Sequence, residues 1–307
     1  MPLALSTSWN AYRHDDARGL LFEIKQLGFS DLELSFNLTG SMVKEIGSLA
    51  DELGLNILSL HNYCPIPEGL TRKEALPDCY SLSSLDSPER KTAIKYTKRT
   101  IDTARSLGAK AVVLHCGRVG IEDKTRELIS LFDAGLVNTK QYKKLKDDFV
   151  VQRAKVACGF FEKAIDSLEE LEPYARDKGI RLGIENRFYY REIPSFEEVG
   201  IILDKFKGSN IFYWHDTGHA RVMQNLGFIE NNDYLKSYSQ DLLGVHLHNI
   251  IGCLDHQAPI KGDINFSAIK PYLKKDTIKV IEAHHPATAE EVKESLNLLK
   301  GILDGIN

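Results

Sequence analysis

Short apolar segments alternate with longer amphipathic segments along the whole chain. The apolar segments are rich in branched and aromatic side chains, and Gly, Asn, Asp or Ser often flank them, which is typical of buried strands. We predict eight strands on this basis, at residues 3–9, 31–36, 56–62, 111–117, 181–186, 211–216, 243–249 and 278–284.

Most intervening segments carry apolar residues every three or four positions, the pattern of a helix with one buried face. Helices are predicted within 17–28, 41–54, 87–108, 195–208 and 287–302. Strands that alternate with helices predict a parallel sheet, and eight such units are the number that closes a (β/α)8 TIM barrel. We therefore expect an α/β protein of this fold class, with residues 1–307 forming a single barrel domain.

Two insertions interrupt the alternation. Residues at about 62–87 are rich in Pro, Ser and Gly and follow the third predicted strand. A long loop of this kind in a compact domain is usually functional, often as a lid. Residues 118–150 follow the fourth predicted strand and contain a helical pattern, so we expect additional helix packed outside the barrel.

Composition and charge narrow the range of partners. The chain has 307 residues and a formal net charge of −4, which gives no overall attraction to nucleic acid or to anionic membranes. No apolar segment is long enough to cross a bilayer, and the N-terminal residues lack the pattern of a signal peptide. The five cysteines are widely spaced and form no disulfide framework. We expect a cytoplasmic protein with a small-molecule substrate rather than a nucleic acid or membrane partner, and a homo-oligomer stays open.

The segment FYWHDTGHARVM, residues 212–223, places an aspartate and two histidines where a predicted strand ends. Asp216, Thr217 and Gly218 are predicted to form the turn that follows this strand. Side chains alternate along a strand, and TIM-barrel active sites lie at the C-terminal ends of the strands. On six consecutive strands, the last inward position holds a His, Asp or Glu: His61, His115, Glu185, Asp216, His246 and Glu282.

Alone, each of these residues is more often a core histidine or a capping carboxylate than a ligand. Together, they would place unpaired charge in a confined space, which is costly unless a cation compensates it. Imidazole and carboxylate ligands suit Zn²⁺, Mn²⁺, Co²⁺ or Fe²⁺ better than Ca²⁺. We therefore predict a divalent metal site at this rim.

Small residues occur two positions before several of the rim residues. Ser59, Gly183 and Gly244 are expected to leave room inside the barrel for ions and substrate. His215 has the opposite parity to Asp216 and is expected to be structural or to support a ligand. Further candidates are Glu33 on the second strand, His248 and His284 on the last two strands, and His219, Asp255 and His256 in loops.

The motifs LGIEN, HDTGHA, VHLHN, LDHQAPIKGDINF and VIEAHH occur in an order that resembles the sugar phosphate isomerase/epimerase superfamily. These are xylose isomerase-like TIM barrels that include ketose 3-epimerases and endonuclease IV. The resemblance to ketose 3-epimerases implies one divalent metal held by Glu185, Asp216, His246 and Glu282. It also implies that Glu185 and Glu282 act as acid and base, and that His219 contacts substrate.

The resemblance to endonuclease IV implies further ligands and up to three zinc ions. The matching positions are His61, His115, His219 and His256. The chain departs from the nuclease pattern after the seventh strand, where Asp-x-His is replaced by Leu254-Asp255-His256. It also lacks the Pro-Gly that follows the strand-four histidine in the nuclease. The number of ions, from one to three, is therefore left open.

These observations favour a metal-dependent isomerase or epimerase of a sugar, sugar phosphate or polyol. Its two glutamates would act through an enediolate. An inosose-type dehydratase, an endonuclease IV-like multi-zinc phosphoesterase or hydrolase, and a non-catalytic binding protein are the alternatives. Expected contacts to substrate are His219, Glu33, Arg187 and Lys261.

Overall fold

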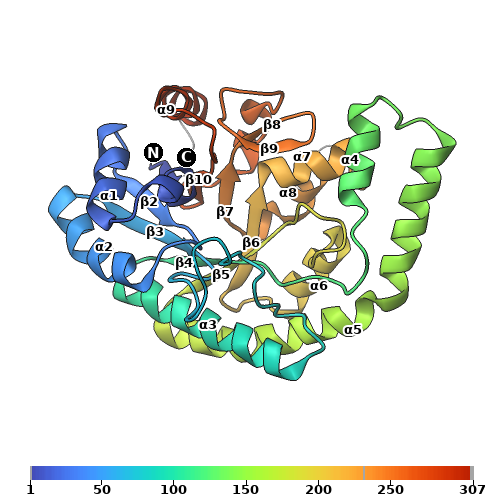
Figure 1. Ribbon diagram of the computed structural model, residues 1–307, viewed down its shortest axis with the longest axis horizontal. Coiled ribbons are helices and arrows are strands. Elements are labelled where there is room, and N and C mark those ends of the chain that lie inside the picture. Colours follow the sequence, from blue (N-terminus) through green and yellow to red (C-terminus); the bar gives the residue numbers. More distant parts are fainter. Residues whose placement is uncertain (1, 231, 305–307) are drawn as a thin grey trace.

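A closed barrel of eight parallel strands forms the centre of the protein (Figure 1). The computed structural model describes residues 2–230 and 232–304. Around the barrel the strands follow the order β1-β10-β7-β6-β5-β4-β3-β2. They are β1 (Ala4–Ser6), β2 (Asp31–Leu34), β3 (Asn56–His61), β4 (Ala111–Leu114), β5 (Arg181–Glu185), β6 (Ile211–Asp216), β7 (Leu242–Leu247) and β10 (Ile278–Ile281). The eight predicted strands and the TIM-barrel fold are confirmed.

Nine helices within the described residues accompany the barrel, and most pack their apolar faces against the outside of the sheet, whereas α4 packs on α5. They are α1 (Ala17–Gln26), α2 (Gly40–Leu53), α3 (Ser87–Ser106), α4 (Thr125–Asp133), α5 (Lys140–Lys178), α6 (Phe196–Lys205), α7 (Thr217–Asn225), α8 (Asp233–Tyr238) and α9 (Ala289–Leu303). Short 3-10 helices span Thr7–Trp9, Ala11–Arg13, Ser239–Asp241, Phe266–Ala268 and Lys270–Tyr272. No helix within residues 2–230 and 232–304 is both long and apolar enough to cross a membrane.

Side-chain caps explain where several of these helices begin. Ser195 and Thr288 each form a capping box with the glutamate three positions later, at α6 and α9. The Asp86 carboxylate accepts the Glu89 N–H at the start of α3. Each cap satisfies backbone N–H groups that have no partner within the helix. Local sequence therefore accounts for the starts of these three helices.

Both predicted insertions extend the loops on one side of the barrel. Residues 62–86 contain no helix or strand, whereas the segment after β4 forms α4 and the first part of α5. The helix α5 has 39 residues, and its N-terminal part projects with α4 away from the barrel (green, Figure 1). A hairpin of β8 (Asn249–Ile251) and β9 (Leu254–Gln257), which the sequence did not predict, follows β7. These additions form walls above the strand ends.

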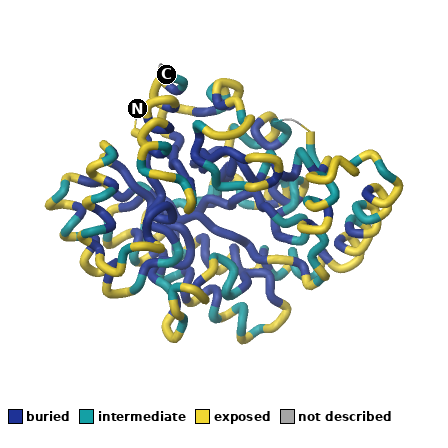
Figure 2. Tube along the Cα trace, turned by 45° about the horizontal axis from the view of Figure 1, so that its top comes forward, coloured by how far each residue is buried: buried dark blue, intermediate teal, exposed yellow. Residues whose placement is uncertain are grey.

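The barrel interior is filled, contrary to the room expected beneath the rim. Trp214 is completely buried among small and branched side chains of the strands. A Cβ atom at Gly244 would come within 2.3 Å of the Trp214 ring, and one at Gly183 within 2.8 Å. The two glycines therefore make room for Trp214 and not for ligand. Buried residues converge on this centre (dark blue, Figure 2), so the rim rests on a packed floor.

Candidate metal centre and catalytic cleft

Seven ionisable side chains lie together at the C-terminal ends of the barrel strands. Six are the predicted rim residues, and the seventh is Glu33 on β2. All are buried, with exposed fractions of 9% or less: Glu33, His61, His115, Glu185, Asp216, His246 and Glu282. The six rim residues lie above Trp214, because each inward position lies two residues beyond the one below it. Glu33 is in register with Ser59, two residues before His61.

The centre of this group is His246, whose Nδ1 atom faces three carboxylates. It lies 2.7 Å from Glu185 Oε1, 2.9 Å from Glu282 Oε2 and 3.7 Å from Asp216 Oδ2. Burial alone would lower the pKa of His246, but the surrounding carboxylates raise it well above its usual value. One potential ligand atom from each of these four residues lies within 4.8 Å of the other three.

This donor set fits a divalent cation. One imidazolium cannot neutralise three buried carboxylates, and buried charge is expensive unless it is paired. Glu33 supports the histidine from behind, because its Oε1 lies 3.1 Å from His246 Nε2. Ser59 Oγ in turn donates to Glu33 at 2.7 Å. A carboxylate on the far imidazole nitrogen orients a metal-binding histidine.

A second group shares Glu185 with the first. His115 Nε2 lies 2.7 Å from Glu185 Oε2, and His61 Nε2 lies 3.8 Å from the same oxygen. On the far side of its ring, His115 Nδ1 lies 3.3 Å from Asp78 Oδ2, and His61 Nδ1 lies 3.0 Å from the Asn62 carbonyl. Donation to these acceptors turns both Nε2 atoms toward Glu185, to which His115 Nε2 donates at 2.7 Å. Loss of the Nε2 protons would let both atoms bind a second ion. Sequence reasoning missed Asp78, which lies in the irregular loop.

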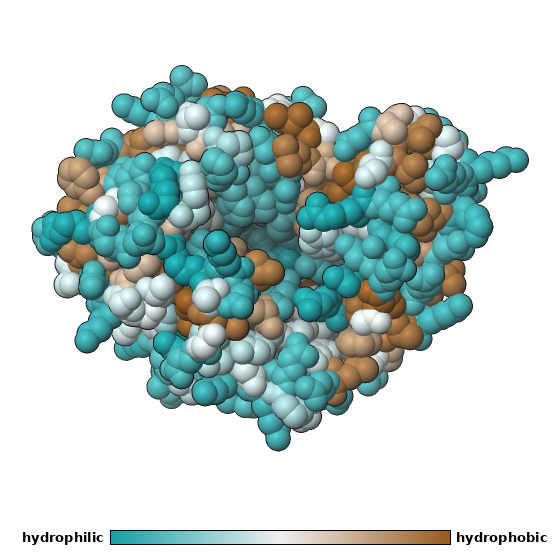
Figure 3. All heavy atoms as spheres, in the orientation of Figure 1, coloured by the Kyte–Doolittle hydropathy of each residue, from teal (hydrophilic) through white to brown (hydrophobic). Residues whose placement is uncertain are grey.

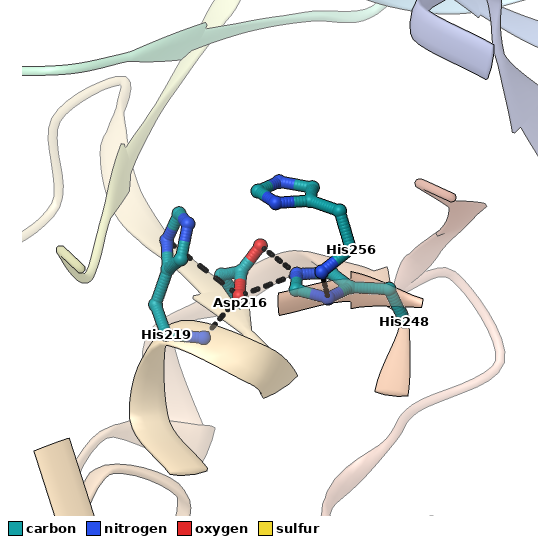
Figure 4. A group of neighbouring side chains, drawn as sticks. All are labelled: Asp216, His219, His248 and His256. Carbon is teal, nitrogen blue, oxygen red and sulfur yellow. Dashed lines mark hydrogen bonds and ion pairs between the residues drawn. The ribbon is translucent and has the colours of Figure 1, made fainter. Parts of the chain in front are cut away.

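A third group surrounds Asp216 on its other side (Figure 4). The Asp216 carboxylate caps helix α7 by accepting the His219 N–H at 2.7 Å. His248 Nε2 lies 2.9 Å from each Asp216 oxygen, and His248 Nδ1 accepts the His256 backbone N–H at 2.9 Å. An imidazole that accepts at Nδ1 carries its proton on Nε2. His248 is thus a hydrogen-bond donor to Asp216, and its Nε2 is not free to bind a metal.

The predicted turn after Asp216 is wrong, because α7 begins at Thr217. Gly218 is needed for a different reason. A Cβ atom there would come within 2.0 Å of the His248 ring. The glycine lets the His248 ring approach the start of α7 closely, a contact between segments distant in the sequence that local turn patterns do not reveal.

His256 reaches the group from the β8–β9 hairpin. Its φ of 53° lies in the left-handed region, which is uncommon for residues other than glycine. Its ring stacks between His248, at 4.2 Å, and His284, at 3.8 Å. Burial would lower the pKa of His256, but Asp255 beside it raises the pKa to about 9. Burial lowers the pKa of His219 to about 4, so this ring is neutral near pH 7.

A cleft of about 760 Å³ opens above these groups (Figure 3). This is large enough for a small-molecule ligand, since such sites measure about 300–1,000 Å³. Arg187 lines it, with Nη1 2.9 Å from Glu185 Oε2 and Nη2 3.2 Å from Glu192 Oε1. Lys261 does not line it and instead pairs with Glu291 at the start of α9. The geometry therefore brings Arg187 to the site and leaves Lys261 outside it.

Comparison with known proteins agrees with the fold. A family model described as xylose isomerase-like TIM barrel matches residues 21–302. No curated protein matches the sequence. Among solved structures, the 3-keto-D-glucoside 4-epimerase of E. coli has a TM-score of 0.68 at 15% identity, over 98% of this chain and 99% of that one.

Two further structures cover almost the whole chain. A D-tagatose 3-epimerase-like protein has a TM-score of 0.68 at 20% identity, over 100% of this chain and 98% of its own. The D-psicose 3-epimerase of Clostridium cellulolyticum H10 has a TM-score of 0.67 at 16% identity, over 99% of each chain. At identities this low, the similarity establishes a common fold.

Proposed function

This chain belongs to the xylose isomerase-like TIM barrel family, and from that premise we propose that it is a divalent-metal-dependent isomerase or epimerase of a sugar or sugar derivative. The observation that carries the proposal is the convergence of Glu185 and Glu282 on one atom, His246 Nδ1, at the base of an open cleft. Two buried carboxylates beside a substrate space are the groups that a reversible proton transfer at carbon requires.

The metal would be held by Glu185, Asp216, His246 and Glu282, whose donor types suit Zn²⁺, Mn²⁺, Co²⁺ or Fe²⁺. A divalent cation bound there would supply Lewis-acid polarisation of a carbonyl and an adjacent hydroxyl group. His61 and His115 would hold a second ion with Glu185. His219 and His256 are the additional ligands proposed near Asp216 and Asp255.

The two glutamates would perform the proton transfers. One glutamate, as a carboxylate, would remove the proton from the carbon next to the substrate carbonyl. The other, in its carboxylic acid form, would return a proton to the resulting enediolate and become a carboxylate. Return from the opposite face inverts the centre, which is epimerisation, whereas return to the neighbouring carbon gives isomerisation. Burial would raise the pKa of Glu185, but His246, His115 and His61 hold it well below its usual range. Glu185 is therefore ionised near neutral pH, as a base must be.

The names of the similar structures support this reaction class. One is a 4-epimerase of a 3-keto-glucoside, and others are 3-epimerases of ketoses. Each of these reactions changes the configuration of a sugar carbon. His219 and Arg187 line the same cleft and are proposed substrate contacts. Glu33 would act through His246, which it supports from behind.

A second candidate is an endonuclease IV-like multi-zinc hydrolase. The observation that favours it is the presence of the second and third groups of potential ligands beside the first. The net charge of −4 gives no general attraction to a DNA backbone, which disfavours a duplex substrate. An inosose-type dehydratase would use the same proton abstraction and then expel water.

Product analysis on the metal-loaded protein distinguishes these reactions. The protein is incubated with a panel of ketoses, polyols and their phosphates, and products are identified by NMR. A change of configuration or of carbonyl position without loss of water supports the proposed function. Loss of water indicates the dehydratase. Cleavage of an abasic-site oligonucleotide or of a phosphate ester, with every sugar unchanged, refutes the isomerase assignment.

A further inference from the structure

Three arginines line the cleft on the side of the insertion that follows β4. They are Arg118 in the segment after β4, Arg126 in the first turn of α4 and Arg191 in the loop after β5. We call these three residues the arginine arm. They line the same 760 Å³ cleft as Glu185 and Glu282, so one ligand can contact both regions.

Each guanidinium group of the arginine arm is held by a neutral acceptor. Arg118 Nη1 donates to the Asp78 carbonyl at 3.5 Å, and Arg191 Nη1 donates to the Ile121 carbonyl at 3.1 Å. Arg126 Nη2 donates to the Tyr189 hydroxyl, and its guanidinium carbon lies 5.3 Å from the centre of that ring. These contacts restrict the guanidinium groups but do not neutralise them.

The neighbouring Arg187 differs from the arginine arm because it forms ion pairs. Its guanidinium pairs with Glu185, Glu192 and Asp78, so its charge is compensated within the protein. Within residues 2–230 and 232–304, no carboxylate forms an ion pair with any of the three arginines of the arm. Two carboxylates, Asp123 and Asp133, also line this side of the cleft. Asp123 already accepts the Thr125 N–H at 3.0 Å. Asp78 and Glu192, which also line the cleft, pair with Arg187.

The chemistry of the arm defines a ligand class. A guanidinium presents a planar set of N–H donors that matches phosphate and carboxylate oxygens, and its affinity for them rises where water is partly excluded. A neutral sugar would leave the three guanidinium groups with only water and the neutral acceptors named above as partners. An anionic group on the substrate would pair with them while the reacting carbon lies beside the two glutamates.

We propose that the substrate of this enzyme is an anionic carbohydrate, whose phosphate or carboxylate group binds Arg118, Arg126 and Arg191. This inference rests on the proposed function, because it places the reacting carbon of the same substrate between Glu185 and Glu282. It adds the chemical class of the substrate and the residues that select it.

Isothermal titration calorimetry on the metal-loaded protein tests the arm. The ligands are inorganic phosphate, D-fructose 6-phosphate, D-fructuronate and neutral D-fructose. Phosphate tests the anion site independently of sugar stereochemistry, and the two anionic sugars distinguish a phosphate group from a carboxylate. We expect at least one anionic sugar to bind about tenfold or more tightly than D-fructose, as expected for one or more charge-assisted hydrogen bonds.

Substitutions of the arginines test whether the arm binds the anionic group. Arg126→Gln and Arg191→Gln are each expected to weaken the preferred anion by about tenfold. Arg105→Gln, at an exposed position on α3, is the matched control and should bind like the wild type. Equal binding of D-fructose and both anionic sugars, or equal losses in all three variants, overturns the proposal. The proposal is also overturned if none of the variants weakens phosphate binding, because the phosphate would then bind the metal and not the arginine arm.

Failure of the proposed function gives a different result. One such result is that anions bind in an arginine-dependent manner while no sugar exchanges a carbon-bound proton with solvent. That result supports anion binding by the arm and refutes the isomerase assignment. If neutral ketoses are converted and their KM is unchanged in Arg126→Gln and Arg191→Gln, the isomerase assignment is supported. The proposal of an anionic substrate is then refuted.

Discussion

At the scale of single residues, the site depends on hydrogen bonds that fix which imidazole nitrogen faces the carboxylates. Glu33 accepts from His246 Nε2, which leaves Nδ1 toward Glu185 and Glu282. Replacing Glu33 by Ala removes this support, and loss of such a partner typically weakens metal binding by about 10–100-fold. Competition with a fluorescent chelator measures the change.

The control for Glu33→Ala is Glu45→Ala on the exposed face of α2. It removes a carboxylate from the surface and should bind metal like the wild type. Both variants are compared by thermal unfolding, so that a general loss of structure is separated from a loss of metal. Equal metal affinity in Glu33→Ala and the wild type would contradict the supporting role of Glu33.

His248 provides a second test at this scale. Together with Asp216, His219 and His256, it forms a group that resembles a metal site. The His256 N–H fixes the proton of His248 on Nε2, where it is donated to Asp216. The amide nitrogen of glutamine can replace an Nε2 donor. His248→Gln should therefore retain the metal, whereas His246→Gln should lose it. Elemental analysis after dialysis measures both, and equal metal loss in the two variants would show that His248 is a ligand.

At the scale of secondary-structure elements, the floor of the site depends on Trp214 and the glycines that face it. Gly244→Ala should lower the free energy of unfolding by about 1–3 kcal/mol, because the added methyl group clashes with the indole ring. Gly301→Ala on α9 meets no atom within 4 Å and should be neutral or slightly stabilising. Urea unfolding compares the two, and similar stabilities would contradict the packing described for the barrel interior.

The strand β10 carries a buried lysine on its outer face. Burial lowers the pKa of Lys279 from its ordinary value of 10.5 to about 8. Its Nζ donates to the Thr277 carbonyl at 2.6 Å and the Lys274 carbonyl at 3.0 Å. Between about pH 8 and 10.5, the unfolded chain retains a proton that the folded protein has lost. The free energy of unfolding therefore rises with pH in this window. Below it, both states bind the proton and this group adds no pH dependence.

Comparison with Lys279→Met isolates this contribution. The stability difference between wild type and variant should change in favour of the wild type by up to about 3 kcal/mol across the window. Urea unfolding at several pH values measures this change. Other groups that titrate in the same range contribute equally to wild type and variant, so their contributions cancel in the difference. A constant difference from about pH 7 to 10.5 would show that Lys279 keeps its ordinary pKa in the folded protein.

Helices and strands could be predicted where the sequence patterns that specify them are local. Strand alternation, helical periodicity and caps such as Ser195 depend on residues near one another in sequence, and so the barrel followed from the sequence. The role of Gly218 did not, because it depends on contact with His248, which lies 30 positions later, just after β7. Trp214 was also missed as the filling of the barrel, since alternation gives the face of a side chain but not the volume that its neighbours leave.

At the scale of the whole molecule, closure of the barrel brings distant residues into one site. Glu33 and Glu282 both approach His246, although they lie near opposite ends of the chain. Parity along the strands was sufficient to predict the six rim residues as a group. Asp78 and the arginine arm could not be predicted as parts of the site, because they lie in the two insertions and in the loop after β5, whose paths no periodicity specifies.

The most direct test of the central claim is solvent proton exchange at matched metal content. Wild type, Glu185→Gln and Glu282→Gln are loaded with metal, their occupancy is measured, and each is incubated in D₂O with a converted sugar. The wild type should introduce deuterium at the reacting carbon, and each variant should be slower by about 10²–10⁴-fold per bound ion, the usual loss when a general base is removed. Conversion without deuterium incorporation, or wild-type exchange rates in both variants at equal occupancy, would contradict the assignment of the two glutamates as acid and base.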